Sequence, residues 1–160
     1  PFLPFLCALI AGAVLTLTIT YADFHQANIQ KNAAEEIMQE YKHSKSKVYF
    51  FGHWGFQYYM ELFGGNSIDL SHINDTWGNI VIAPLNNTGS LPMENFFKKF
   101  NSDLSLVKTW EKKISSFVHL MRPERNAGFY SHVFGKMPYS FGKKASESFL
   151  ILSVDKPEKD

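Results

Sequence analysis

The first 22 residues of the chain form one apolar run that contains no charged side chain. Sixteen of these 22 positions are apolar, and all 31 charged residues of the chain follow Ala22. At about 1.5 Å per residue, a helix of this length measures about 33 Å, which is enough to cross a hydrocarbon core of about 30 Å. The pattern therefore predicts a transmembrane helix over residues 1–22.

Two other structures also produce an apolar segment of this kind. Thr20-Tyr21-Ala22 provides small residues of the type that a signal peptidase recognises, but the segment lacks the positively charged start of a signal peptide. A buried core helix is the second alternative, although such helices are usually shorter. The chain begins with Pro1 instead of an initiator Met. We therefore expect the helix to be the last span of a larger protein.

The polar positions that follow the apolar run have helical spacing. From Asp23 to about Lys42, apolar side chains that include Phe24, Ala27 and Ile37 recur at steps of three or four residues. This pattern is typical of an amphipathic helix, which we expect to continue directly from the membrane span. With the short polar connection that follows it, this segment covers residues 23–46.

The rest of the sequence alternates between predicted strands and helices. Runs of β-branched and aromatic residues, or of alternating apolar and polar residues, predict strands at 48–51, 79–83, 104–110 and 149–154. Helical spacing predicts helices at 54–63 and 93–100. A strand, a glycine turn and a helix form the start of a βαβ unit. The fold class is therefore predicted as α/β, a small soluble domain with a mostly parallel or mixed sheet.

Two segments carry weaker patterns. Residues 114–120 are apolar and fit either a strand or a helix, whereas 122–142 is rich in Gly, Pro and aromatic residues and predicts an ordered loop region. We expect the α/β domain to cover 47–155 and a charged tail to cover 156–160.

Composition narrows the class of protein. A length of 160 residues suits one domain of ordinary size, and a single Cys excludes a disulfide scaffold or a Cys-rich metal site. The net charge of +1 gives no reason to expect nucleic acid as a partner. Six scattered His residues show no pair at ligand spacing, so we expect no metal site and no cofactor in this stretch.

The most informative polar residues follow the first predicted strand, at Gly52 to Glu61. Open α/β sheets bind ligands at the carboxyl ends of their strands. Aromatic faces beside amide and imidazole groups suit a sugar, which presents C–H faces and hydroxyl groups. The candidate substrate-binding residues here are His53, Trp54, Gln57 and Tyr58. The alternative is that the aromatic rings are core or membrane-facing packing and that His53 caps the helix.

A second group of candidate residues lies in the segment from Arg125 to His132. A guanidinium such as that of Arg125 can hold a phosphate or carboxylate through two hydrogen bonds, and His132 can donate another. The alternative is a surface loop that its own aromatic side chains hold in place.

Three segments together resemble the C-terminal part of a bacterial glycosyltransferase of family 39 type. They are Tyr21-Ala-Asp-Phe-His-Gln-Ala-Asn28 after the apolar helix, Gly52-His-Trp-Gly-Phe-Gln-Tyr-Tyr-Met60 after the strand, and Arg125-Asn-Ala-Gly-Phe-Tyr-Ser-His132 with Gly135 and Pro138. Such enzymes are polytopic membrane proteins related to protein O-mannosyltransferases. The resemblance covers nearly the whole chain.

The resemblance implies a larger protein that transfers a sugar from a polyprenyl-phosphate carrier to an acceptor on the extracytoplasmic side of the cell membrane. Its implied partners are the lipid bilayer, the preceding transmembrane helices and a lipid-linked sugar or glycan acceptor. The catalytic acid of the family lies in an early loop outside this chain, so no catalytic residue is assigned here. The domain would assist acceptor binding or cap the membrane bundle.

Two other classes of function remain open from the residues alone. One is a single-pass, membrane-anchored extracytoplasmic binding module without catalytic activity, with its ligand site at the corner formed by His53–Tyr59. The other is a purely structural domain that caps a helical bundle and binds nothing.

Overall fold

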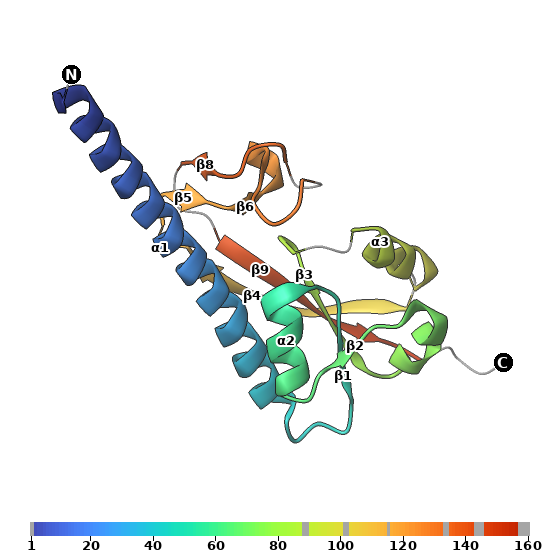
Figure 1. Cartoon of the computed structure of the whole chain (residues 1–160). Helices are drawn as coiled ribbons and strands as arrows, with labels where there is room; N and C mark the ends of the chain where they lie inside the picture. Colours follow the sequence, from blue (N-terminus) through green and yellow to red (C-terminus); the bar gives the residue numbers. More distant parts are fainter. Residues whose placement is uncertain are drawn as a thin grey trace. The chain divides into compact units, whose positions relative to one another are not determined.

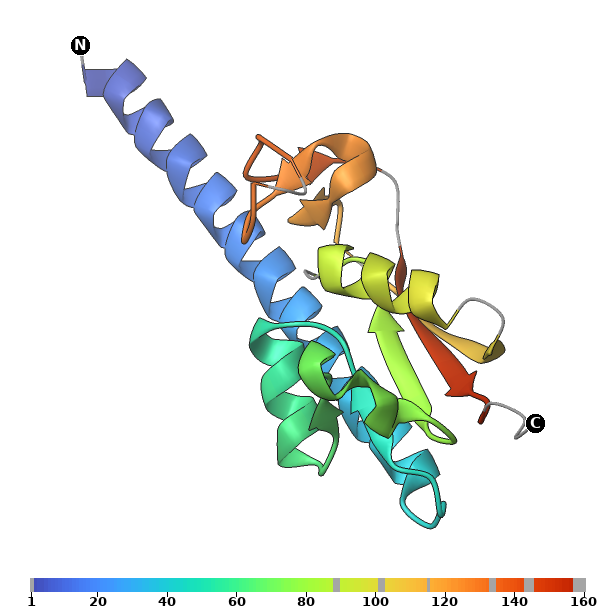
Figure 2. The ribbon, with the colours of Figure 1, turned by 90° about the vertical axis from the view of Figure 1, so that its right-hand side faces the viewer.

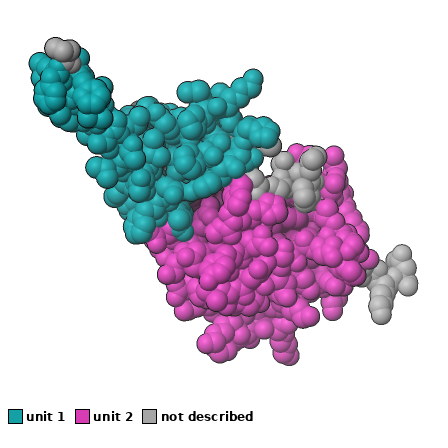
Figure 3. Space-filling view, viewed as in Figure 1, with its two compact units in different colours: residues 1–27, 113–145 teal, residues 28–112, 146–160 magenta. Residues whose placement is uncertain are grey.

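The structure is a computed structural model that describes residues 2–87, 90–100, 103–114, 116–132, 135–142 and 146–156. The chain divides into two compact units, which are coloured separately in Figure 3. Unit 1 consists of Pro1–Ala27 and Lys113–Ala145, and unit 2 consists of Asn28–Lys112 and Ser146–Asp160. Of the charged tail expected at 156–160, residues 157–160 lie outside the described residues.

Helix α1 runs without interruption from Phe2 to Tyr41, which confirms that the apolar run and the amphipathic segment form one helix (Figure 1). Among the described residues, it is the one helix that is long and apolar enough to cross a membrane. None of the apolar window that meets this test is buried within the described part of the chain. The apolar half of α1 is therefore not a core helix of this chain.

The second half of α1 has a buried face, but this face differs in part from the predicted one. Ala33, Ala34 and Ile37 are buried, whereas Phe24 and Ala27 are exposed, although their spacing placed them on the apolar side. Small side chains allow a helix backbone to approach its neighbour closely, so alanines occupy much of the contact. The apolar spacing alone does not distinguish this close contact from one made by bulky side chains.

Unit 2 contains a five-stranded sheet in the order β2-β1-β3-β9-β4. Its strands are β1 (Val48–Phe50), β2 (Asn66–Ser67), β3 (Ile80–Pro84), β4 (Leu104–Lys113) and β9 (Ser146–Val154). Strand β1 is parallel to both β2 and β3, whereas β3 and β9 are antiparallel. The sheet is therefore mixed, as one form of the α/β prediction allowed, and the four predicted strands are all present.

Helices cover both faces of this sheet. On one face, alternate residues of β3 and β9 pack against Phe96 of α3 (Ser90–Lys99), against Phe100 directly after this helix, and against Ile73 of the 3-10 helix η1 (Leu70–Thr76). On the other face, the Phe56 ring of α2 (Trp54–Leu62) contacts a ring from β1 and one from β9. Figures 1 and 2 show α2 and α3 on opposite faces of the sheet. Unit 2 is therefore a three-layer α/β arrangement.

Side chains of β4 join the second half of α1 to the sheet of unit 2. The Trp110 indole Nε1 donates a hydrogen bond of 2.8 Å to Glu36 Oε2, and Lys108 forms an ion pair with Glu40. Lys108 and Trp110 are two residues apart on a strand, so their side chains point to the same face. This face of β4 is the one that α1 covers.

Unit 1 combines the first part of α1 with short paired strands. Strand β5 (Val118–His119) pairs with β8 (Ser140–Phe141), and β6 (Met121–Arg122) pairs with β7 (Ala127–Gly128), with the 3-10 helix η2 (Pro123–Arg125) between β6 and β7. The segment predicted as an ordered loop, 122–142, thus contains β7, β8 and the second residue of β6. Strands of two residues are too short to leave an alternating pattern in the sequence.

Close backbone contacts explain the glycines of this segment. A Cβ atom on Gly128 would lie 2.2 Å from the carbonyl oxygen of Ser131 and 2.7 Å from that of Gly135. The same turn is held by backbone hydrogen bonds from Gly128 N–H to the Met137 carbonyl (2.9 Å) and from Met137 N–H to the Asn126 carbonyl (3.0 Å). Position 128 therefore has no space for a side chain.

We expect Gly128→Ala to lower the free energy of unfolding by about 1–3 kcal/mol or more, because the opposing carbonyl groups belong to the turn itself and cannot move away independently. Denaturant unfolding in detergent micelles measures the change. Gly55→Ala in α2 is the matched control, since a Cβ atom on Gly55 would lie 3.5 Å from Gln30 Oε1, which is an ordinary contact distance. This control should keep or raise the stability, by up to about 1 kcal/mol. Equal stabilities of the two variants would contradict the tight turn.

Candidate functional site

The order of the strands places a crevice after β1. The chain leaves β1 through α2 to reach β2 on one side, and it then passes through η1 to β3 on the other side of β1. In open α/β sheets, the point where successive connections diverge in this way forms a crevice at the carboxyl ends of the strands. The turn that begins at Gly52 lies at this point.

A cavity of about 460 Å³ occupies this position, and we call it the carboxyl-edge cavity. Its walls come from the ends of β1 and β2 and the turns after them: Phe50, Phe51, Gly52, His53, Ser67, Ile68, Asp69 and Leu70. Small-molecule sites typically measure about 300–1,000 Å³ and combine an apolar lining with a few polar groups. The cavity has both properties.

Hydrogen bonds between two adjacent loops hold His53 in place. The His53 N–H donates to Asn87 Oδ1 (3.0 Å), and Asn87 Nδ2 donates back to the His53 carbonyl (3.3 Å). Gly52 precedes it at φ +117°, a conformation that favours glycine. His53 is the N-cap residue of α2, but its side chain makes no capping hydrogen bond to the described residues. The imidazole of His53 is therefore not used as a helix cap.

The other three residues predicted at this turn lie on the surface of α2. The exposed fraction is 42% for Trp54 and 61% for Tyr58, so neither ring belongs to the core. Gln57 Nε2 donates a hydrogen bond of 2.8 Å to Glu61 Oε1 on the next turn of the helix. Of these four predicted residues, His53 is the one found among the described residues that line the carboxyl-edge cavity. Trp54 follows it directly in the chain.

The turn after β2 adds polar residues that the sequence analysis did not identify. Asp69 is the N-cap of η1 and accepts hydrogen bonds from the Ser71 N–H (2.8 Å) and the Ser71 hydroxyl (2.7 Å). The other oxygen of Asp69 lies 3.0 Å from His72 Nδ1. A second cavity of about 280 Å³ contains Asp69 and His72 and shares part of its wall with the carboxyl-edge cavity.

These contacts set the protonation of both side chains. Hydrogen bonds from Ser71 and then from His72 lower the pKa of the Asp69 carboxyl to about 2. The hydrogen bond to Asp69, followed by its charge, raises the pKa of His72 above the ordinary value of 6.5. Ser71 and Asp69 both contact the same ring nitrogen of His72, at 2.9 and 3.0 Å. In a serine nucleophile triad the two partners use different ring nitrogens, so this cluster lacks the geometry of a triad.

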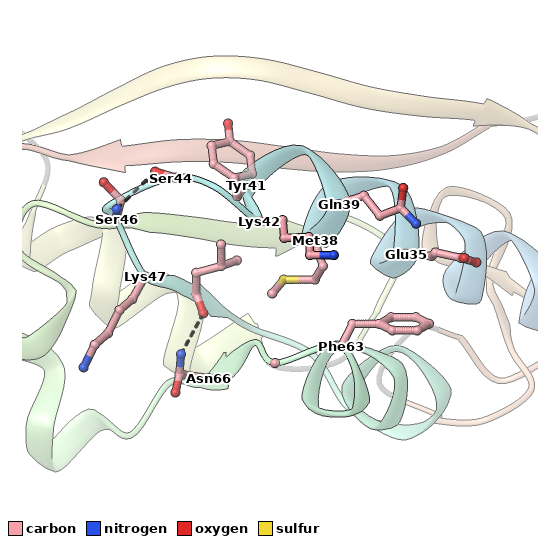
Figure 4. Close-up of a pocket in the computed structure, with 12 residues that line it drawn as sticks. Glu35, Met38, Gln39, Tyr41, Lys42, Ser44, Ser46, Lys47, Phe63 and Asn66 are labelled. Atoms are coloured by element: carbon pink, nitrogen blue, oxygen red, sulfur yellow. Dashed lines mark hydrogen bonds between the residues drawn. The ribbon is translucent and has the colours of Figure 1, made fainter.

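A cavity of similar size, about 470 Å³, lies at the opposite edge of the sheet, beside the amino end of β1. Figure 4 shows it between the end of α1 and the segment that follows α2. Several of its polar groups are used within the fold. Asn66 Nδ2 donates to the Val48 carbonyl (3.2 Å), and the Lys47 N–H donates to Asn79 Oδ1 (2.8 Å). These groups are less available to a ligand than the exposed imidazole of His53.

Arg125 and His132 lie in unit 1, whereas the four residues of the first candidate group lie in unit 2. Arg125 is exposed, and its Nη1 donates a hydrogen bond of 2.9 Å to the Phe141 carbonyl. The His132 carbonyl accepts from the Gly135 N–H (3.1 Å). These contacts hold the loop together, so backbone hydrogen bonds contribute to its order as well as aromatic packing. No group of three or more His, Cys, Asp and Glu side chains gathers at metal-ligand distance among the described residues.

We expect a titration of the His72 imidazole to give a pKa above 6.5, and Asp69→Asn to return this pKa towards 6.5 because the hydrogen bond and the negative charge are both lost. Asp75→Asn should lower the pKa less, since Asp75 acts through its charge alone. NMR of the imidazole signals measures all three values. A pKa that does not change in Asp69→Asn would contradict the contact.

The sign of the pH dependence follows from the two shifts. The pKa of Asp69 is lowered on folding. The contribution of Asp69 to folding stability is therefore fully present above the ordinary pKa of 3.8 and is lost as the pH falls through about 2. The pKa of His72 is raised, so its contribution is present below 6.5 and is lost at higher pH. The pair is therefore most fully formed between about pH 4 and 6.5. Both side chains are exposed, which keeps the effect on stability small.

The geometry is that of a cavity at the carboxyl edge of two parallel strands, with His53 and Asp69 in its wall and the exposed Trp54 next in the chain. No known protein family, curated protein or solved structure matches this chain.

Proposed function

We propose that this chain is the C-terminal, membrane-anchored part of a glycosyltransferase of family 39 type, and that its α/β unit binds the glycan acceptor at the carboxyl-edge cavity. The proposed enzyme takes its sugar from a polyprenyl-phosphate carrier. The observation that carries the proposal is the combination of an uncovered apolar helix half with a cavity whose wall contains His53.

The chemistry of the cavity supports a sugar as its ligand. The ionised carboxylate of Asp69 can accept hydrogen bonds from sugar hydroxyls, and the imidazole of His53 can donate or accept one. The exposed ring of Trp54 provides a flat apolar face of the kind on which the C–H side of a sugar stacks. A neutral, hydroxyl-rich ligand suits such a site better than an anion, because a negative charge in its wall repels anions.

The assignment to a glycosyltransferase rests on the resemblance of the segments at Tyr21–Asn28, Gly52–Met60 and Arg125–His132. In this proposal, transfer itself takes place on residues outside the chain, and the α/β unit binds and orients the acceptor. Holding an acceptor in position lowers the entropic part of the barrier to a two-substrate reaction. A defect in the cavity should therefore affect the acceptor more than the donor.

The test uses membranes that contain the full-length protein, a polyprenyl-phosphate hexose as donor and a lipid-linked glycan as acceptor. We expect His53→Ala and Trp54→Ala each to raise the KM for the acceptor about tenfold, which corresponds to the loss of about 1.4 kcal/mol of binding. The KM for the donor should not change. Leu62→Ala is the matched control, because Leu62 is an exposed residue of the same helix.

Two results would count against this function. If transfer occurs and neither substitution affects the acceptor, the cavity does not bind it and the α/β unit only caps the membrane bundle. If the folded full-length protein transfers no sugar from any of several donors, the chain belongs to a different class, such as an anchored binding module.

The proposed location of the α/β unit is the extracytoplasmic side of the cell membrane. The resemblance supports this side, whereas the lysines after the span, Lys31, Lys42, Lys45 and Lys47, favour the cytoplasm under the positive-inside rule. That rule applies to short loops near a span, and large domains are translocated largely regardless of their charge.

We expect a cysteine introduced by Leu62→Cys, in a Cys7→Ser background, to react with a membrane-impermeant maleimide in intact cells of the expressing bacterium. The same protein without Leu62→Cys reports any labelling at other cysteines, and lysed cells give the maximum. Labelling that requires lysis would place the α/β unit in the cytoplasm and would remove the proposed acceptor role.

A further inference from the structure

Unit 1 exposes two pairs of neighbouring aromatic side chains. Phe117 and Phe141 have exposed fractions of 64% and 51%, and their ring centroids lie 5.8 Å apart. Phe129 and Tyr130 form a second exposed pair with centroids 5.0 Å apart. We call these four residues the unit 1 aromatics. Paired exposed rings of this kind mark an interaction surface more often than single exposed apolar residues do.

Both pairs connect to the same short part of α1. Tyr139 and Ile19 of α1 both pack against the cluster of Ala22, Val118 and Leu120, and the centroid of the Tyr139 ring lies 5.4 Å from that of Phe141. The hydroxyl of Tyr130 donates a hydrogen bond to the carboxylate of Asp23. The unit 1 aromatics are therefore attached to the helix within residues 19–23, where the uncharged run ends and the first charge occurs.

This position corresponds to the edge of the hydrocarbon core if α1 crosses a membrane. Asp23 is the first charged residue after the apolar run, so residues 19–23 would fall at the boundary between acyl chains and headgroups. Tyr and Trp are enriched at this depth because their rings are amphipathic, and Phe side chains of membrane-surface elements insert at the same boundary. The attachment point thus places the aromatic pairs at the level where such side chains are stable.

The distribution of charge agrees with the same surface. Unit 1 contains six Lys and Arg residues and two Asp and Glu residues, which gives a charge of +4. Unit 2 contains the other ten basic and thirteen acidic residues, which gives −3. The overall charge of +1 conceals this separation. A basic unit beside the span is attracted to anionic lipid headgroups.

We propose that the unit 1 aromatics insert into the interfacial layer of an anionic phospholipid bilayer, beside the span that α1 forms. The rings occupy the boundary between headgroups and acyl chains, and the exposed basic side chains of unit 1, Lys113, Arg125 and Lys136, face the lipid phosphates. This surface would hold unit 1 against the membrane next to α1. The inference rests on the membrane span of the proposed function and is independent of sugar transfer.

The test uses the whole chain, reconstituted in nanodiscs that contain phosphatidylglycerol. Cys7→Ser removes the one cysteine of the sequence, and single cysteines then carry a nitroxide spin label. Phe117→Cys, Phe141→Cys and Phe129→Cys report on both aromatic pairs. Ile10→Cys reports on the span, and Leu62→Cys in α2, where the exposed fraction is 60%, is the aqueous reference.

The measurement compares collisions of each label with oxygen, which concentrates in lipid, and with a water-soluble nickel complex. We expect the ratio of oxygen to nickel collisions at positions 117, 129 and 141 to exceed that at position 62 several-fold. The ratio at position 10 should be the highest of all. Three reporter positions prevent a local folding defect at any one of them from deciding the result.

The outcomes separate this inference from the function on which it rests. If position 10 lies in lipid and positions 117, 129 and 141 match position 62, the interfacial surface is wrong while the span stands. If position 10 is also in water, the span itself fails, and with it the proposed function. If the three labels lie as deep in nanodiscs of phosphatidylcholine alone as in those that contain phosphatidylglycerol, the preference for anionic lipid is wrong.

Discussion

The rest of the structure depends on one helix whose two halves have different surroundings. None of the apolar window in the first half of α1 is buried among the described residues, whereas the second half is packed into unit 2. Exposed apolar surface of this extent is unfavourable in water, and the proposed membrane span would remove it from water. Because α1 is one continuous helix, the apolar segment leads directly into the segment whose side chains pack against the rest of the chain.

The change between the halves occurs within a few residues. Ala22 is buried against Val118 and Leu120, and Asp23 accepts a hydrogen bond from Tyr130. The segment that makes these contacts comes from more than 90 positions later in the sequence, between β4 and β9, and returns to the helix there. Unit 1 thus uses distant sequence to cover one side of the last turn of the apolar run. The net charge of the whole chain does not reveal that the two units differ in charge, because the values for the two units nearly cancel.

Long elements could be predicted from the sequence, whereas those that depend on distant pairing could not. The extent of α1, the turn from β1 into α2 and the four longer strands follow from apolar runs and spacing. Strand β2 has two residues, and it exists because Phe50 pairs with Ser67. The site divides in the same way: His53 follows a predictable strand, but Asp69 reaches the cavity only through β2. The local signal for Asp69 was its position before Ser71 as a helix cap.

The protonation of Asp69 separates binding from catalysis at the carboxyl-edge cavity. A general acid must carry a proton near the working pH, and a carboxyl with a pKa of about 2 is ionised far above that value. Its low basicity also makes it a poor general base, although Oδ2, which contacts only His72 among the described residues, can accept a further hydrogen bond. Asp69 is therefore suited to hold hydroxyl groups and unsuited to move protons between them. This composition is consistent with the proposed role of the cavity, which is to bind a ligand without taking part in proton transfer.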